Sequence, residues 1–146
     1  MKVEELRPGN IVEVNHYEYG DMYASVTSIN DVGDLCLHLL DERFTKEEYE
    51  CTMNEVCSIP ITEELLLKNG FRERMGYFQY DDCNDSISIK MSLGYTFIEY
   101  AKLCFNPEDV TETEYGSSLE FPNQLQVHTL QNIWHLLTGN ELEIKQ

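Results

Sequence analysis

The stretch Ile11–Leu40, IVEVNHYEYGDMYASVTSINDVGDLCLHLL, consists of short apolar runs separated by residues that favour turns. β-Branched and aromatic residues dominate the runs, which is typical of short strands. Turn chemistry recurs at Tyr19–Asp21 and at Asn30–Gly33. The predicted strands are 11–15, 22–29 and 34–40. This stretch therefore predicts a meander of short antiparallel strands.

A further short apolar run, Val56–Ile59, follows a polar segment and ends at a proline. About sixty residues with this pattern resemble the small five-stranded barrels of the Src-homology (SH3) type, in which closure removes exposed sheet edges. Residues 1–60 are thus predicted to form an SH3-like barrel or an open meander. Glu42–Glu50 is too polar to be buried, and we expect a loop or a solvated helical turn there.

Residues 61–146 predict a second lobe, which begins with a short helix. Thr62 is a suitable N-cap, two glutamates follow it, and Lys68 with Asn69-Gly70 ends the helix. Alternating or apolar runs then predict an antiparallel sheet. Its predicted strands are 77–80, 86–91, 95–105 and 117–121, with a hairpin turn at 81–85.

An apolar stripe near the C-terminus predicts an amphipathic helix. Leu130, Ile133, Trp134 and Leu137 recur at helical spacing before Thr138-Gly139, and a final short strand is predicted at Glu141–Ile144. We expect the helix to cover one face of the second sheet. The predicted fold class is α+β, mainly β, with lobes 1–60 and 61–146 packed together as one unit.

The chain is strongly acidic, with 10 basic and 27 acidic residues and a net charge of −17. Such a field repels phosphate backbones and anionic membranes, so we expect neither direct nucleic-acid binding nor membrane association. The carboxylates could serve only as a solvated surface, could dock a basic partner, or could mimic DNA. A protein partner or self-association remains the expected form of interaction.

The remaining motifs give no sign of catalysis. The five cysteines are irregularly spaced, the four histidines lack the spacing of ligand pairs, and no nucleophile or phosphate-loop motif occurs. We therefore expect a non-enzymatic protein with reduced cysteines, no metal and no cofactor. The polar opening residues and the short apolar runs predict a soluble protein of the cytoplasm.

Three of the ten basic residues, Lys68, Arg72 and Arg74, lie within seven positions of one another beside the aromatic Tyr77, and this is where cations interrupt the acidic background. Arginine offers a planar fork for phosphate and an aromatic ring can stack on a base, so these four residues are the candidate ligand-binding site. Alternatively, the cations stabilise the preceding helix end and the aromatic residues pack in the core.

Three segments carry a resemblance to a family. They are LRPGNIV (6–12), IPITEELLLKNGF (59–71) and HTLQNIWHLLTGNELEI (128–144). Together they resemble a widespread set of small uncharacterised proteins of gut Bacteroidetes and their prophages and phages. The resemblance implies a bacterial host cytoplasm or phage origin and supplies no activity or site residues.

These observations favour a non-enzymatic binding or interaction protein of a bacterial mobile or phage accessory genome. One alternative is an anti-defence protein that sequesters an anionic small molecule such as a signalling nucleotide. The other is an acidic DNA mimic that inhibits a nucleic-acid-binding protein.

Overall fold

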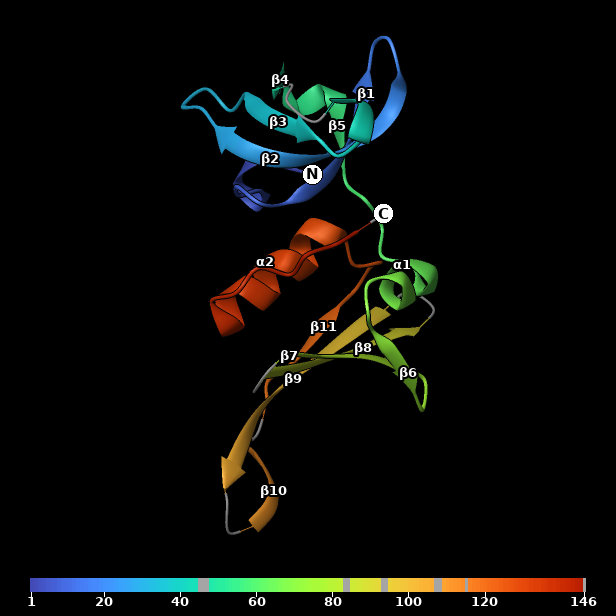
Figure 1. Cartoon of the computed structure of the whole chain (residues 1–146), viewed down its shortest axis with the longest axis vertical. Coiled ribbons are helices and arrows are strands. Elements are labelled where there is room, and N and C mark those ends of the chain that lie inside the picture. The colour runs from blue at the N-terminus through green and yellow to red at the C-terminus, as the bar shows by residue number, and fades with distance from the viewer. Residues whose placement is uncertain (45–47, 83–84, 93–94, 107–108, 115, 146) are drawn as a thin grey trace. The chain divides into compact units, whose positions relative to one another are not determined.

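The computed structural model describes residues 1–44, 48–82, 85–92, 95–106, 109–114 and 116–145, with the backbone alone for 103–106 and 109–114. It is mainly β, with two antiparallel sheets and a C-terminal helix (Figure 1). The predicted α+β class is confirmed at this level. The chain forms two compact units, residues 1–60 with 126–144 and residues 61–125 with 145–146.

The first unit contains a five-stranded sheet. Its strands are β1 (Ile11–His16), β2 (Gly20–Ile29), β3 (Leu35–Leu39), β4 (Glu48–Cys51) and β5 (Val56–Cys57), in the order β4-β3-β2-β1-β5. The first three strands form the predicted meander, β4 continues it beside β3, and β5 returns beside β1. Among the described strands β4 and β5 are not paired, so the order is open and the SH3-like barrel stays a prediction.

The segment predicted as a loop or helical turn holds both a short 3-10 helix, Glu42–Phe44, and the strand β4. The predicted helical turn is confirmed, but the prediction that this segment contains no strand is wrong. β4 forms because only one of its faces needs to be apolar: Cys51 is buried and Tyr49 half-buried, whereas Glu48 and Glu50 stay exposed.

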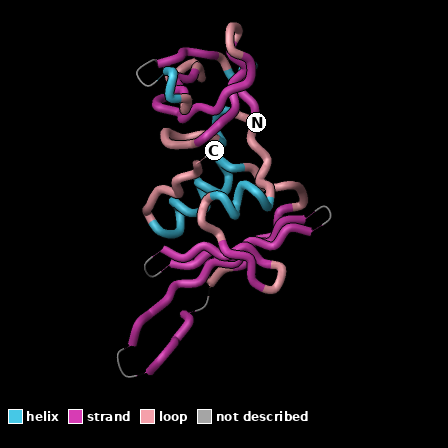
Figure 2. The backbone as a smooth tube through the Cα atoms, turned by 45° about the vertical axis from the view of Figure 1, so that its right-hand side comes forward, coloured by secondary structure: helices cyan, strands magenta, loops and turns pink. Residues whose placement is uncertain are grey.

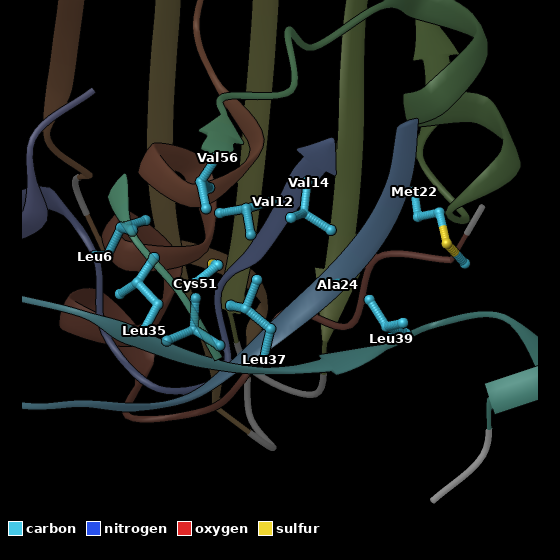
Figure 3. Close-up of a cluster of buried hydrophobic side chains, with 11 residues drawn as sticks. Leu6, Val12, Val14, Met22, Ala24, Leu35, Leu37, Leu39, Cys51 and Val56 are labelled. Carbon is cyan, nitrogen blue, oxygen red and sulfur yellow. The ribbon is translucent and has the colours of Figure 1, made fainter. Parts of the chain in front are cut away.

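Alternation along the strands builds the core of this unit. Val12 and Val14 of β1 face Leu35 and Leu37 of β3 across the curved sheet, and all four are essentially inaccessible to solvent (Figure 3). Two further 3-10 turns, Val3–Glu5 and Met53–Glu55, flank the sheet. Because the side-chain period of a strand is two, this apolar row fixes which face of the sheet is inside.

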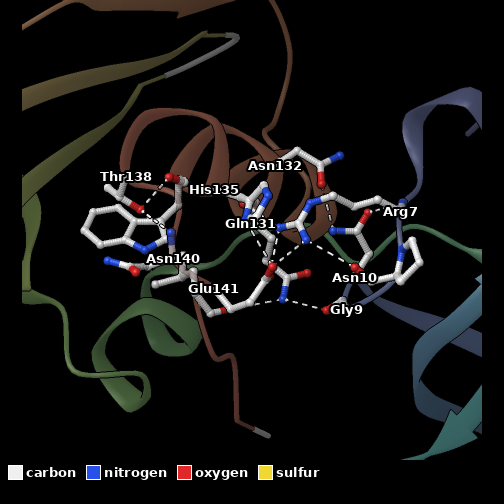
Figure 4. A network of polar contacts seen from close by, with 12 residues as sticks. Arg7, Gly9, Asn10, Gln131, Asn132, His135, Thr138, Asn140 and Glu141 are labelled. Atoms are coloured by element: carbon white, nitrogen blue, oxygen red, sulfur yellow. Dashed lines mark hydrogen bonds and ion pairs between the residues drawn. The ribbon is translucent and has the colours of Figure 1, made fainter.

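The C-terminal helix α2 (Val127–Thr138) belongs to this first unit. The predicted lobes, 1–60 and 61–146, differ from the observed units in the placement of residues 126–144. Hydrogen bonds account for the difference (Figure 4): the buried Gln131 Oε1 accepts from the Ile11 N–H at 2.8 Å, and its Nε2 donates to the Leu142 carbonyl at 3.1 Å. The helix ends at Gly139, whose φ of 75° suits glycine.

The final strand predicted at Glu141–Ile144 is wrong, because these residues are held by side chains instead of a neighbouring strand. Arg7 forms a two-pronged ion pair with Glu141, with nitrogen–oxygen distances of 2.8 and 2.9 Å. Leu142 is buried and its carbonyl accepts from Gln131. No strand within the described residues pairs with this segment.

The second unit begins with α1 (Glu63–Lys68), where the Thr62 hydroxyl accepts from the Leu65 N–H at 3.1 Å as the predicted N-cap. Its sheet (magenta in Figure 2) has the order β10-β9-β8-β7-β6, and β11 also pairs with β9. The strands are β6 (Arg72–Arg74), β7 (Tyr77–Asp82), β8 (Asp85–Ser92), β9 (Tyr95–Asn106), β10 (Asp109–Glu114) and β11 (Ser118–Phe121).

Two strands of this sheet, β6 and β10, were not predicted from the sequence, because both contain few apolar residues. The hairpin turn predicted at 81–85 includes residues 83–84, which lie outside the described residues.

We predict that Trp134→Ala lowers the free energy of unfolding by about 3–5 kcal/mol, as truncation of a large buried aromatic side chain typically does. Trp134 is 1% exposed on α2, whereas Leu136 on the same helix is 83% exposed. Leu136→Ala is therefore the matched control, with an expected change within about 0.5 kcal/mol. Urea unfolding measures both. A loss below about 1 kcal/mol for the tryptophan variant would contradict burial.

The buried histidine His128 predicts a pH-dependent stability. His128 is not part of the apolar stripe of Leu130, Ile133, Trp134 and Leu137, which predicts a partly exposed position, but it is only 3% exposed, so that prediction is wrong. Burial holds its pKa below the ordinary 6.5, and the Glu5 carboxylate 4.0 Å away offsets this only in part. Unfolding then takes up a proton below about pH 6.5, so the free energy of unfolding should fall as the pH is lowered through that region.

His128→Gln should remove this part of the pH dependence, and His135→Gln, at an exposed position of the same helix, should retain it. Urea unfolding at pH 7.5 and 5.5 tests the difference between the two variants. An equal change for both would show that other groups cause the slope.

Candidate functional site

Strand register divides the side chains of the second sheet between two faces. Phe78, Ile89 and Ile98 lie opposite one another on adjacent strands, and all are buried. The residues between them project to the other side, which we call the open face. Because directly opposed residues share a face, the register alone identifies the members of the open face.

Two rows of side chains cross the open face. One row runs from Arg72 through Gln79 and Ser88 to Glu99, each residue opposite the next. The adjacent row begins with the pair Arg74 and Tyr77 and continues at Lys90, which lies opposite Phe97. In the row that begins with Arg74, cations and aromatic rings thus alternate. In the row that begins with Arg72, two neutral polar side chains lie between the cation and the carboxylate of Glu99.

A tight hairpin turn brings Arg74 and Tyr77 together. The two residues between them, Met75 and Gly76, have φ values of 52° and 81°, the pattern of a type I′ turn. Glycine suits its position, whereas methionine in the left-handed region is uncommon. Met75 is fully exposed at the tip of this turn.

The open face is hollowed beside this turn. The hollow has a volume of about 560 Å³ and is lined by Arg74, Met75, Tyr77, Gln79, Ser88 and Glu99. It therefore combines a guanidinium, an aromatic ring, an amide, a hydroxyl and a carboxylate. These groups can hold an anion at one end and hydrogen-bond a polar ring or sugar at the other.

The cations of the open face are available to a ligand. Arg72 and Arg74 are exposed, and neither takes part in an ion pair among the described residues. The Lys90 ammonium lies 5.2 Å from the centre of the Tyr77 ring, a cation–π distance. Lys90 thereby orients the tyrosine and adds a third positive charge to the face.

Of the four residues singled out from the sequence, the structure brings three together and leaves one apart. Arg72, Arg74 and Tyr77 share the open face, and of these Arg74 and Tyr77 also line the hollow. Lys68 is exposed in the last turn of α1 and is not among the residues that line the hollow. Dipole stabilisation, the alternative considered for these cations, therefore describes Lys68 better than the two arginines.

Sequence reasoning missed Lys90 and Glu99 as members of the same face. The alternation Ser86, Ser88, Lys90 already indicates that Lys90 lies on the polar side of its strand. No signal in the sequence shows that it lies beside Tyr77, because that neighbourhood depends on strand register. Two aromatic residues near the arginines, Phe71 and Phe78, are buried. This agrees with the alternative prediction that the aromatic residues of this segment pack in the core.

Among the residues that the structure describes, the cysteines and histidines form no comparable arrangement. Cys36, Cys51 and Cys57 are unbridged, and burial raises the pKa of the Cys51 thiol to about 11. Cys83 and the side chain of Cys104 lie outside the described residues. In the part of the chain that the structure describes, no three metal-binding side chains converge.

Comparisons of the chain with protein-family models, with curated proteins and with solved structures find no match. None of the helices described here has the length and apolar character needed to cross a membrane.

Proposed function

We propose that this chain is a non-enzymatic binding protein whose ligand contacts the open face of the second sheet. The observation that supports it is the grouping of Arg72, Arg74 and Lys90 with Tyr77 on one exposed face of a chain that carries a net charge of −17. Elsewhere on so acidic a protein an anion is repelled. A local group of unpaired cations is therefore the place where an anionic ligand can bind.

The ligand that suits this face best is a phosphate-bearing small molecule with a planar ring, such as a nucleotide. The arginines bind phosphate through charge-assisted hydrogen bonds, and Tyr77 offers a ring on which a base can stack. Gln79, Ser88 and Glu99 line the hollow together with Arg74 and Tyr77, and they can hydrogen-bond the polar edge of a base or a sugar hydroxyl. The carboxylate of Glu99 limits how far the phosphate can extend across the face.

Sequestration of a signalling nucleotide is the biological role that this binding would serve in a bacterial mobile or phage accessory genome. The family resemblance of the three segments described above is what suggests that setting, in the cytoplasm of a bacterial host. The genes that lie beside this one test the setting. A position among anti-defence genes supports it, and a position among unrelated housekeeping genes argues against it.

Arg72→Ala combined with Arg74→Ala should abolish nucleotide binding, because the double substitution removes both guanidinium ligands of the phosphate and, among the described residues, leaves Lys90 as the one cation of the face, opposed by the carboxylate of Glu99. Both side chains are exposed, so the free energy of unfolding should change by no more than about 0.5 kcal/mol per site. Calorimetric titration with a panel of cyclic and linear nucleotides measures the binding.

Lys2→Ala combined with Lys145→Ala is the matched control, since it removes two exposed positive charges that are not among the residues that line the hollow. This variant should bind as the wild type does. If no nucleotide binds at micromolar concentration, or if binding survives the double arginine substitution, the anionic ligand is ruled out and interaction with a protein remains.

A further inference from the structure

Five aromatic rings meet around the β1–β2 turn of the first unit. The His16 ring stacks on Tyr17 and Tyr19 at centroid distances of 4.8 and 4.9 Å, and the Tyr49 ring tilts against it at 4.9 Å. Phe44 extends the group, 4.7 Å from Tyr19. We call these five residues the aromatic cluster.

One side of the aromatic cluster is anchored and the other is open to solvent. Phe44 and Tyr49 pack against the hydrophobic core, and His16 is buried. In contrast, Tyr17 is 81% exposed and Tyr19 is 48% exposed. Exposed aromatic side chains held in place by a packed base are typical of binding surfaces, since little conformational entropy is lost when a partner covers them.

The surroundings of the aromatic cluster are acidic. The three described segments that build it, residues 13–21, 41–44 and 48–51, contain seven carboxylates and a single base, Arg43. Glu18 is exposed in the turn between Tyr17 and Tyr19. This field attracts cationic partners and repels anionic ones, so the character of this surface is the opposite of that of the open face.

The surface already binds one guanidinium of its own chain. The Arg43 Cζ lies 5.4 Å from the centre of the Phe44 ring, and Nη2 lies 2.6 Å from Asp41 Oδ2. The hydrogen bond from Arg43 lowers the pKa of Asp41 to about 2, so this carboxylate stays ionised at neutral pH. A ring face and a carboxylate acting together are the usual means of recognising arginine.

Tyr17 and Glu18 repeat this combination of ring and carboxylate at the exposed side of the cluster. Within the described residues Glu18 forms no ion pair, so its charge is available to a partner. The cluster extends over the β1–β2 turn, the Glu42–Phe44 helix and β4, which is more surface than one guanidinium can cover. An extended chain with spaced cations fits it better than a single small cation does.

We propose that the aromatic cluster and its carboxylates are a docking surface for an arginine-bearing segment of a partner protein, with one guanidinium against Tyr17 and Glu18. This proposal goes beyond the nucleotide site of the second sheet. The two surfaces belong to different units and select opposite charges, so each can fail without the other.

A fluorescent peptide of five Gly-Arg repeats tests the proposal against the full-length protein, with fluorescence anisotropy as the measurement. The wild type should bind it, and the same peptide with citrulline in place of arginine should not bind. Tyr17→Ser should weaken binding by about three- to tenfold, the range expected for one cation–π contact. Glu18→Gln should also weaken binding and should reduce its dependence on salt.

Two variants in the second unit control for unspecific attraction to an acidic protein. Tyr95→Ser removes an exposed ring, and Glu64→Gln removes an exposed charge. Both should leave binding within about twofold of wild type, as should the double arginine variant of the open face. Unfolding in urea checks that Tyr17→Ser keeps its stability, which its exposure leads us to expect.

Three results would overturn the proposal. The first is that the wild type does not bind the arginine peptide, and the second is that Tyr17→Ser binds it as well as the wild type does. The third is that the control variants weaken binding as much as Tyr17→Ser does. Sedimentation adds a fourth, because a dimer that disappears in Tyr17→Ser would show that a second copy of the chain occupies this surface.

Discussion

One buried glutamine side chain joins three separate segments of the first unit. Gln131 lies on α2 and is 2% exposed, and it accepts a hydrogen bond from the backbone of β1, 120 residues earlier in the chain, while donating to the Leu142 carbonyl. An amide in such a position has to be satisfied by specific partners, because an unpaired buried polar group is costly. This residue, the Arg7–Glu141 pair and the hydrogen bond from Asn10 to Asn132 together join α2 to the N-terminal part of the chain.

This constraint makes the second unit an insertion into the first. The chain leaves the first unit at Pro60 and re-enters it at Gln126, where the two residues form an isolated antiparallel bridge. The Val127 N–H also donates to the Ile59 carbonyl at 2.9 Å. These two crossings are thus fixed by backbone hydrogen bonds at one place, and the chain crosses once more after Ile144, because Lys145 belongs to the second unit. The inserted sheet is free to differ in surface character from the unit that carries it.

The two units differ in that way. Strand alternation buries Phe78, Ile89 and Ile98 on one side of the inserted sheet, so the other side has to display whatever polar residues the sequence offers. Those residues include most of the cations near the middle of the chain. On the first unit, rings gather among carboxylates at the β1–β2 turn instead. A binding protein with two surfaces of opposite charge is consistent with both arrangements.

Local patterns in the sequence determined the first three strands of the meander, the Thr62-capped helix, the apolar stripe with Trp134, and the choice of Arg72 and Arg74 as candidate ligand-binding residues. Each depends on residues within a few positions of one another, so propensity, capping and alternation suffice. Only the tertiary structure decided that residues 126–144 complete the first unit, that Lys90 and Glu99 join the arginines while Lys68 does not, and that His16 gathers aromatic rings. These neighbourhoods arise from strand register and from hydrogen bonds across more than a hundred residues. A periodic pattern specifies which face of an element is apolar, but it carries no information about which distant segment packs there.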